Sequence, residues 1–240
     1  MMMYRVGGML WVINGAIPIL ISMYIWKLVS PETSQISIYF IGAILFERIT
    51  QTWSLGEISD RIKDGTLAQT LLRPYNYIFE IFARDVGSKA NRLVSTLPFV
   101  VVLWFVYLPQ YNFNPINILV GIPALILGYL VNFYLNSSLG LLTNWTGDAD
   151  GIARTLDVTK SMTAGLFIPY MFMPQAVKDI LVFTPFRYIF SFPLEIVLGQ
   201  LSSNSLLFGY ATIIFWSLFL VFIFNWLSKK SMKYFTSHGG

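Results

Sequence analysis

The sequence predicts an all-α polytopic membrane protein with six transmembrane helices, from its composition and its long apolar runs. Of the 240 residues, 55% are hydrophobic and only 12% are charged, whereas a soluble domain carries about 25% charged residues. Apolar stretches of about 20 residues, long enough to cross a bilayer, recur between short charged segments. We therefore predict one transmembrane domain that covers residues 1–240.

The first two predicted spans cover residues 9–28 and 36–53. The first run is longer than the apolar core of a signal peptide, and no small-residue cleavage pattern follows it. The second run carries Glu47 and Arg48 in its last third, where charges are costly unless they pair, face a partner or reach the interface. We interpret this span as ending before the two charges, which then lie at the cytoplasmic interface. Pairing within the membrane is the alternative.

The other four predicted spans cover residues 93–107, 116–142, 161–173 and 206–226. A charged, amphipathic stretch leads into the third span, and polar side chains line the second half of the fourth. Small and polar residues in a span usually mark helix–helix contact, and a substrate-lining face is the second interpretation. The candidate path-lining residues are Glu47, Arg48, Asn132 and Asn136.

Residues 174–200 are apolar, but three prolines and four charged residues interrupt them, so no uninterrupted span fits. Irregular backbone at membrane depth has to be buried in protein or line a wet cavity. We therefore predict two short re-entrant helices on the outer side of the membrane, before the last span. A kinked span followed by a loop is the alternative.

The lysines and arginines orient the predicted helices in the bilayer. With six spans and both termini in the cytoplasm, 13 of these residues lie on the cytoplasmic side and 3 on the outer side. An excess of positive charge marks the cytoplasmic loops. The chain is therefore predicted to be a multi-pass protein of the inner, cytoplasmic membrane with both termini in the cytoplasm.

The segment between the second and third spans, residues 55–74, is the longest charged amphipathic run of the chain. Two isoleucines four residues apart share one helical face, and charged side chains cover the rest of the helix. Gly65 interrupts the helix, and Pro74 stops the short helix that follows. A partner protein can bind such a helix–break–helix element. The alternative is a solvated loop helix that binds no partner. The candidate docking residues are Glu57, Ile58, Arg61, Ile62, Gly65, Leu67, Leu71, Arg73 and Pro74.

Several kinds of chemistry are excluded by the residues present. The chain has no cysteine, and its one histidine, His238, lies close to the C-terminus. It contains no GxxxxGK[ST], HExxH or GxSxG motif, so we predict no catalytic residue, metal ligand or cofactor in this chain. No basic patch is interleaved with exposed aromatic residues, so nucleic acid is not an expected partner.

Two segments resemble the ABC-2-type permeases of ABC transporters. Residues 57–77 read EISDRIKDGTLAQTLLRPYNY, and one branch of that family carries a similar pattern after its second span. Residues 166–200 resemble the proline-containing outer region of the same family, and the chain ends in Gly-Gly, as members of this branch often do. The matching positions are Ile62, Gly65, Leu67, Leu71, Leu72, Arg73 and Pro74, then Pro174, Pro185, Phe186, Pro193, Leu198 and Gly199.

The resemblance implies a six-span exporter subunit that pairs with a second permease copy, identical or different. Each copy would dock on a cytoplasmic ATP-binding cassette subunit, which would hold ATP and Mg²⁺. Residues 55–74 would form the coupling helix, and residues 174–200 the re-entrant outer helices. The family pattern begins with an amphipathic helix ahead of Tyr-Arg, whereas Tyr4 and Arg5 stand almost first here, so we expect that helix to be missing or very short. A non-transporting membrane scaffold or assembly factor is the alternative function.

Overall fold

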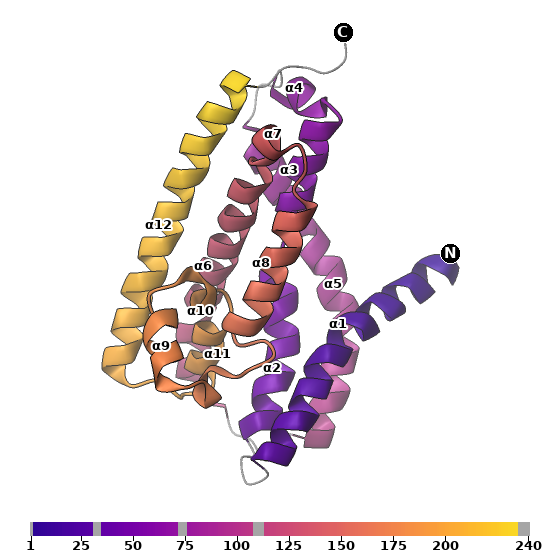
Figure 1. Cartoon of the computed structure of the whole chain (residues 1–240). Coiled ribbons are helices and arrows are strands. Elements are labelled where there is room, and N and C mark those ends of the chain that lie inside the picture. The colour runs from indigo at the N-terminus through magenta and orange to yellow at the C-terminus, as the bar shows by residue number, and fades with distance from the viewer. Residues whose placement is uncertain (1, 31–34, 72–75, 108–112, 235–240) are drawn as a thin grey trace.

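Helices dominate the computed structural model, which describes residues 2–30, 35–71, 76–107 and 113–234, and no strand occurs in these segments (Figure 1). Three helices of this part are long and apolar enough to cross a membrane: α5 (Tyr77–Tyr107), α6 (Pro115–Gly140) and α12 (Ser203–Tyr234). The shortest of them, α6, has 26 residues and spans about 39 Å, more than the ~30 Å hydrocarbon core of a bilayer. The all-helical prediction is confirmed, and the count of six spans stays a prediction.

Two further helices precede these spans, α1 (Met2–Val29) and α2 (Gln35–Thr50). With 16 residues, α2 is shorter than a typical span. Most of its residues are nevertheless buried, because α1, α5, α6 and α11 all pack against it. The hydroxyl of Tyr39 on α2 donates a hydrogen bond to the Gly165 carbonyl at 2.8 Å. Residues 51–53, which we placed in the second span, instead form the connection to the next helix.

Helix α6 lies at the centre of the bundle and packs against α2, α3, α10, α11 and α12. Three short helices follow one another beside it: α9 (Gln175–Leu181), α10 (Pro185–Ile189) and α11 (Ser191–Val197). We predicted two helices in residues 174–200, and the structure has three. Pro185 stands at the start of α10, where its fixed φ favours the first helical turn. The depth of these helices in a bilayer stays a prediction.

The predicted fifth span, residues 161–173, is wrong as a helix. The observed helix is α8 (Asp150–Thr163), and the backbone after it is irregular up to a single 3₁₀ turn, Tyr170–Phe172. The chain leaves the helix at Gly165, whose φ of 93° is not helical, and the apolar stretch before the next proline is too short for another span. The prediction from apolarity alone therefore begins about ten residues after the observed start of α8.

The two ends of the bundle carry different elements (Figure 1). The helices α3 (Ser54–Lys63), α4 (Thr66–Leu71) and α7 (Thr143–Thr146) lie at one end, together with the C-terminal end of α12. The C-terminal end of α1 and the short helix α9 lie at the other end. This separation agrees with the two sides that the charge count predicts, and the orientation in a cell membrane stays a prediction.

Candidate functional site

The charged segment after α2 forms a helix–break–helix element, as the sequence predicts. Gly65 has a φ of 70° and separates α3 from α4, a conformation that glycine adopts without steric cost. Ile58 of α3 is 0% exposed and Leu67 of α4 is 2% exposed, because both pack into one apolar cluster with α5, α6 and α12. These apolar side chains therefore attach the element to the bundle.

A close backbone contact holds α3 against α6. Gly140 lies at the C-terminal end of α6, and a Cβ atom there would stand 2.8 Å from the Leu55 carbonyl oxygen and 3.1 Å from the Ile58 Cβ. Only glycine permits this approach without a shift of the backbone. Helix α3 is thus seated directly on α6 rather than separated from it by side chains.

Ion pairs tie the same element to α5 and to the segment between α7 and α8. Arg61 Nη2 lies 2.6 Å from Glu57 Oε1 and 3.1 Å from Glu80 Oε1 of α5. Lys63 Nζ lies 2.6 Å from Asp148 Oδ1. The hydrogen bond in this second pair favours both charged forms, so it raises the pKa of Lys63 and lowers the pKa of Asp148.

The structure divides the predicted docking residues into two groups. Ile58 and Leu67 are buried, Ile62 is half-buried, and the Arg61 guanidinium is paired within the chain. Arg73, Pro74 and the Leu71 side chain lie outside the described residues. The exposed face of α3 and α4 consists of residues that we did not select, Gly56, Asp60, Lys63, Asp64, Thr66 and Gln69. Asp60 lies two positions after Ile58, and Asp64 two positions after Ile62, so the aspartates are on the helical face opposite the isoleucines.

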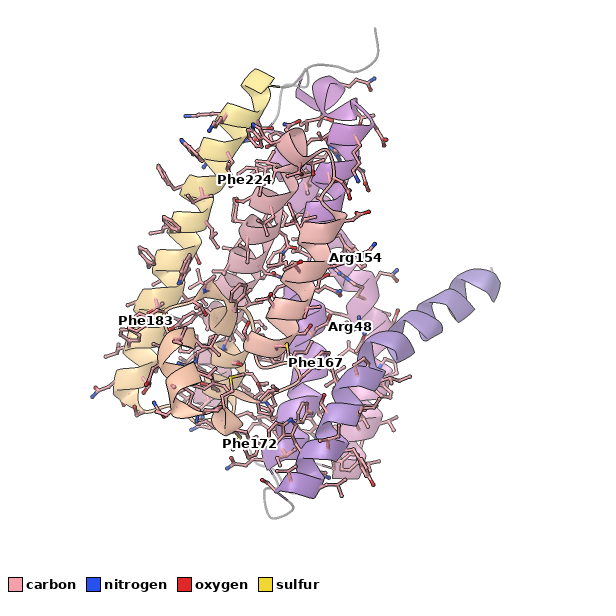
Figure 2. The ribbon with its side chains drawn as sticks, in the orientation of Figure 1. Arg48, Arg154, Phe167, Phe172, Phe183 and Phe224 are labelled. Carbon is pink, nitrogen blue, oxygen red and sulfur yellow. The ribbon has the colours of Figure 1, made fainter. Side chains whose placement is uncertain are left out.

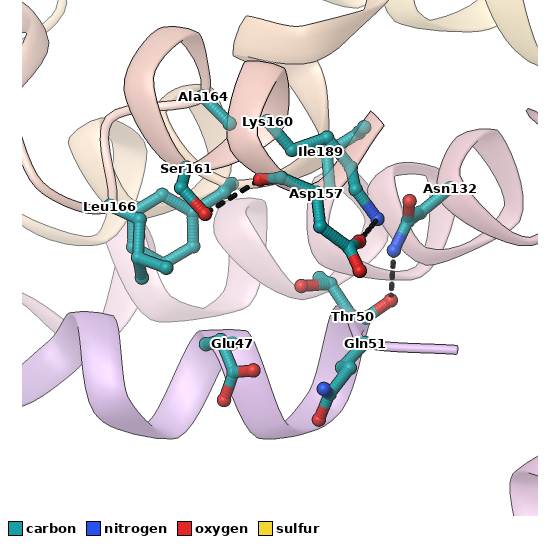
Figure 3. Close-up of a pocket in the computed structure, with 11 residues that line it drawn as sticks. Glu47, Thr50, Gln51, Asn132, Asp157, Lys160, Ser161, Ala164, Leu166 and Ile189 are labelled. Carbon is teal, nitrogen blue, oxygen red and sulfur yellow. Dashed lines mark hydrogen bonds and ion pairs between the residues drawn. The ribbon is translucent and has the colours of Figure 1, made fainter. Parts of the chain in front are cut away.

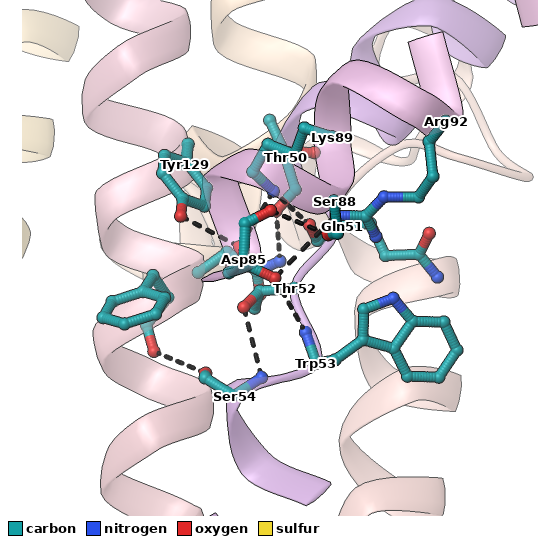
Figure 4. A network of polar contacts seen from close by, with 12 residues as sticks. Thr50, Gln51, Thr52, Trp53, Ser54, Asp85, Ser88, Lys89, Arg92 and Tyr129 are labelled. Atoms are coloured by element: carbon teal, nitrogen blue, oxygen red, sulfur yellow. Dashed lines mark hydrogen bonds and ion pairs between the residues drawn. The ribbon is translucent and has the colours of Figure 1, made fainter. Parts of the chain in front are cut away.

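A buried charge cluster joins this element to the long helices (Figure 4). Asp85 Oδ1 of α5 accepts a hydrogen bond from the Trp53 backbone N–H at 3.3 Å, and Asp85 Oδ2 accepts one from the Tyr129 hydroxyl at 2.9 Å. Lys89 Nζ lies 3.1 Å from Asp85 Oδ2 and donates to the Gln51 carbonyl. The cluster thus connects α5 and α6 to the backbone that leads into α3.

We predicted only a charged, amphipathic stretch for this part of α5, and the burial of its charges was missed. Asp85 is 5% exposed, Lys89 is 7% exposed and Arg92 is 9% exposed. The i, i+4 spacing of Asp85 and Lys89 was the available signal, because it places opposite charges on one helical face. Because these side chains are buried, each charge needs a partner of opposite sign, since an unpaired charge away from water is costly.

A polar pocket of about 280 Å³ lies where α2, α6 and α8 meet the end of α10 (Figure 3). Glu47 and Asn132, two of the four predicted path-lining residues, line it together with Gln51, Asp157 and Lys160. The structure thus brings residues that are 85 positions apart in the chain to one cavity.

The other two predicted residues, Arg48 and Asn136, do not line the pocket but contact residues that do. Asn132 Nδ2 donates to the Thr50 carbonyl at 2.8 Å, and Asn136 Nδ2 donates to Asn132 Oδ1 at 2.8 Å. Arg48 is 2% exposed, and its Nε lies 3.4 Å from Glu47 Oε2 (Figure 2). Helix α2 continues through both residues to Thr50, and the two charges pair inside the bundle, because pairing offsets part of their desolvation. That the membrane span itself ends before Glu47 stays a prediction.

Three apolar helices of membrane-crossing length, counted over the described residues, make the chain a membrane-embedded helical bundle. Residues 30–239 match the family model described as ABC-2 family transporter protein. The chain therefore belongs to the ABC-2 transporter family and is a membrane transport subunit, a permease. No curated protein matches the chain.

Proposed function

We propose that this permease is a subunit of an ATP-driven exporter in the inner membrane. It forms a translocation path with a second permease copy, identical or different, and a separate ATP-binding cassette subunit supplies the energy with bound ATP and Mg²⁺. The observation that carries the proposal is the two-sided α3–α4 element. Its apolar side is fixed to the bundle, and its polar side is exposed for a partner.

The contacts of this element give it a mechanical role in the proposal. Because the Gly140 contact seats α3 on α6, a partner that displaces α3 also displaces α6. The Arg61–Glu80 ion pair and the Asp85 cluster carry the same movement to α5. Such a rigid connection between helices is what a motion driven from outside the membrane requires.

The polar pocket lies next to this connection, and we propose that it is part of the path. Asn132 holds the last turn of α2 through the Thr50 carbonyl, one residue before the segment that the charge cluster binds. A shift of α3 therefore changes the width of the pocket. Gln51 Oε1 is buried there without a hydrogen-bond partner in the described part of the chain, so it is available to a substrate.

Capture of the partner tests the proposed function. A tagged chain purified from its native membrane in mild detergent is expected to bring down an ATP-binding cassette protein. Reversing two charges of the exposed face, Asp60→Lys with Asp64→Lys, is expected to lower the captured amount at least about tenfold, since like charges at an interface cost several kcal/mol.

The matched control for that experiment is Asp179→Lys, an exposed aspartate at the opposite end of the bundle. It is expected to leave capture unchanged. If the unmodified chain captures no ATP-binding cassette protein, the export proposal is overturned. Equal loss with both variants would place the contact elsewhere on the molecule.

A leucine at the helix break is expected to impair coupling. Leucine at the φ of 70° that Gly65 adopts costs about 1–2 kcal/mol, so α4 has to reorient. We expect Gly65→Leu to lower the ATPase rate of the captured complex several-fold. Gly151→Leu is the control, because a Cβ atom at Gly151 meets nothing within 4 Å. Intact function of the Gly65 variant would favour the scaffold alternative.

A further inference from the structure

A second polar pocket, of about 600 Å³, lies at the end of the bundle opposite α3 and α4, and we call it the distal pocket. Its walls are the 3₁₀ turn before α9, the helices α9 to α11, and the first two turns of α12. Phe172 and Phe183, labelled in Figure 2, mark this side of the molecule. The volume falls within the range of about 300–1,000 Å³ that is typical of small-molecule sites.

A buried ion pair forms one wall of the distal pocket. Arg187 Nη2 of α10 lies 2.8 Å from Glu195 Oε2 of α11, and the two side chains are only 9% and 7% exposed. The Arg187 guanidinium also stacks on the Tyr170 ring at 3.8 Å from its centroid. These contacts hold both charged groups in place, so this wall of the pocket is preformed in the absence of a ligand.

Two atoms of this ion pair have no hydrogen-bond partner among the residues described. They are the donor Arg187 Nε and the acceptor Glu195 Oε1, and both are buried. A buried polar atom without a partner costs about 1–3 kcal/mol, so such atoms are expected to be met by a ligand or a water molecule. A hydroxyl group suits both atoms, because it donates one hydrogen bond and accepts others.

The charges around the distal pocket balance. Lys178 and Arg187 are opposed by Asp179 and Glu195, so the lining has no net charge with which to select an ion. The remaining polar lining consists of amides and hydroxyls, those of Gln175, Gln200, Asn204 and Ser205 together with the Tyr170 hydroxyl. Such a lining suits a ligand that forms many neutral hydrogen bonds rather than a charged one.

We propose that the distal pocket binds a neutral, polyhydroxylated ligand, that is, a saccharide. Each sugar hydroxyl can donate and accept, as the unpaired donor and acceptor of the Arg187–Glu195 pair require. The ligand is either a free saccharide or the sugar headgroup of a glycolipid, which share this chemistry. The site lies apart from the α3–α4 element and does not depend on the ATP-binding partner.

Binding to the whole chain in lipid nanodiscs tests the proposal, with no sugar-based detergent present because its headgroup would compete. Maltose, added free, is measured by isothermal titration calorimetry. A monoglucosyl diacylglycerol, included in the nanodisc lipid, is measured by native mass spectrometry. Saturable binding of maltose supports a free saccharide, and binding of the glycolipid alone supports a lipid-linked one.

Variants assign the binding to the distal pocket. Asn204→Leu is expected to weaken it about tenfold, the effect of one lost hydrogen bond. Ser203→Leu, the neighbouring exposed residue that does not line the pocket, is expected to leave it unchanged. Arg187→Met combined with Glu195→Leu removes both unpaired atoms without leaving a lone buried charge, and it is expected to abolish binding.

Two results would overturn the proposal. One is a folded wild-type chain that binds neither probe, which would mean that water alone fills the two positions. The other is binding that Asn204→Leu and Ser203→Leu affect equally. Thermal unfolding of each variant shows whether it is folded, and the Asn204 and Ser203 pair decides the question even if the double variant does not fold.

Discussion

Asp85→Ala is expected to destabilise the bundle by about 3–5 kcal/mol, the largest effect of any single substitution considered. The change leaves Lys89 and Arg92 buried without the carboxylate that lies 3.1 Å from the first and 3.8 Å from the second. It also removes the acceptor of the Trp53 N–H and of the Tyr129 hydroxyl. Thermal unfolding in detergent, followed by tryptophan fluorescence, measures the loss.

Asp157→Ala is the matched control. Asp157 also pairs with a lysine, Lys160 at 3.0 Å, but its side chain is 71% exposed. An ion pair whose carboxylate is exposed to solvent contributes about 0–1 kcal/mol, so the control is expected to unfold close to the wild-type temperature. Equal unfolding temperatures for the two variants would show that the cluster does not stabilise the connection to α3.

A compensating substitution separates loss of charge balance from loss of packing. Asp85→Asn combined with Lys89→Met removes one charge of each sign and keeps side chains of similar size. Replacing both members of a buried ion pair is often close to neutral. This double variant is therefore expected to be more stable than Asp85→Ala, with only the Arg92 charge left uncompensated.

Gly140→Ala is expected to have the second-largest effect, a loss of about 1–3 kcal/mol. The added Cβ would stand 2.8 Å from the Leu55 carbonyl oxygen and 3.2 Å from the Leu55 Cα, so the backbone of α3 has to move away from α6. Hydrogen exchange measured by mass spectrometry is expected to show faster exchange in α3, and thermal unfolding gives the size of the loss.

Gly87→Ala is the control for that substitution. Gly87 also lies within a long helix, α5, and a Cβ atom there meets nothing within 4 Å. Alanine favours a helix over glycine by up to about 1 kcal/mol, so this variant is expected to be as stable as the wild type or more stable. A Gly140 variant that also gains stability would contradict the close seating of α3 on α6.

Local patterns predicted the elements whose causes are themselves local. The break at Gly65 follows from a glycine between two amphipathic runs, and the structure confirms it with a φ of 70°. The long apolar runs predicted α6 and α12 to within a few residues, except at the C-terminal end of α12. The prediction failed at residues 161–173, because α8 ends at Thr163 and the apolar residues after it form an irregular segment.

The candidate site was predictable only in part. Glu47 and Asn132 were chosen because they are polar in apolar surroundings, and both line the polar pocket. The same rule missed Asp85 and Lys89, since a charged stretch beside a span is usually solvated and no local pattern tells that α2 and α6 cover it. The amphipathic pattern of residues 55–74 made Ile58 a docking candidate, although its apolar side chain is turned into the bundle.

The amino-acid sequence is sufficient to show that the chain is a helical membrane protein, where its charged element breaks, and which transporter family it resembles. Composition and periodicity indicate the helical membrane protein, and Gly65 marks the break. The short motifs at residues 57–77 and 166–200 carry the resemblance. The tertiary structure decided which charges are buried, which face of α3 remains free, and that Arg187 and Glu195 meet beside the distal pocket. These properties depend on contacts between residues that are distant in sequence, and burial, which sets the cost of an unpaired charge, exists only after the helices have packed.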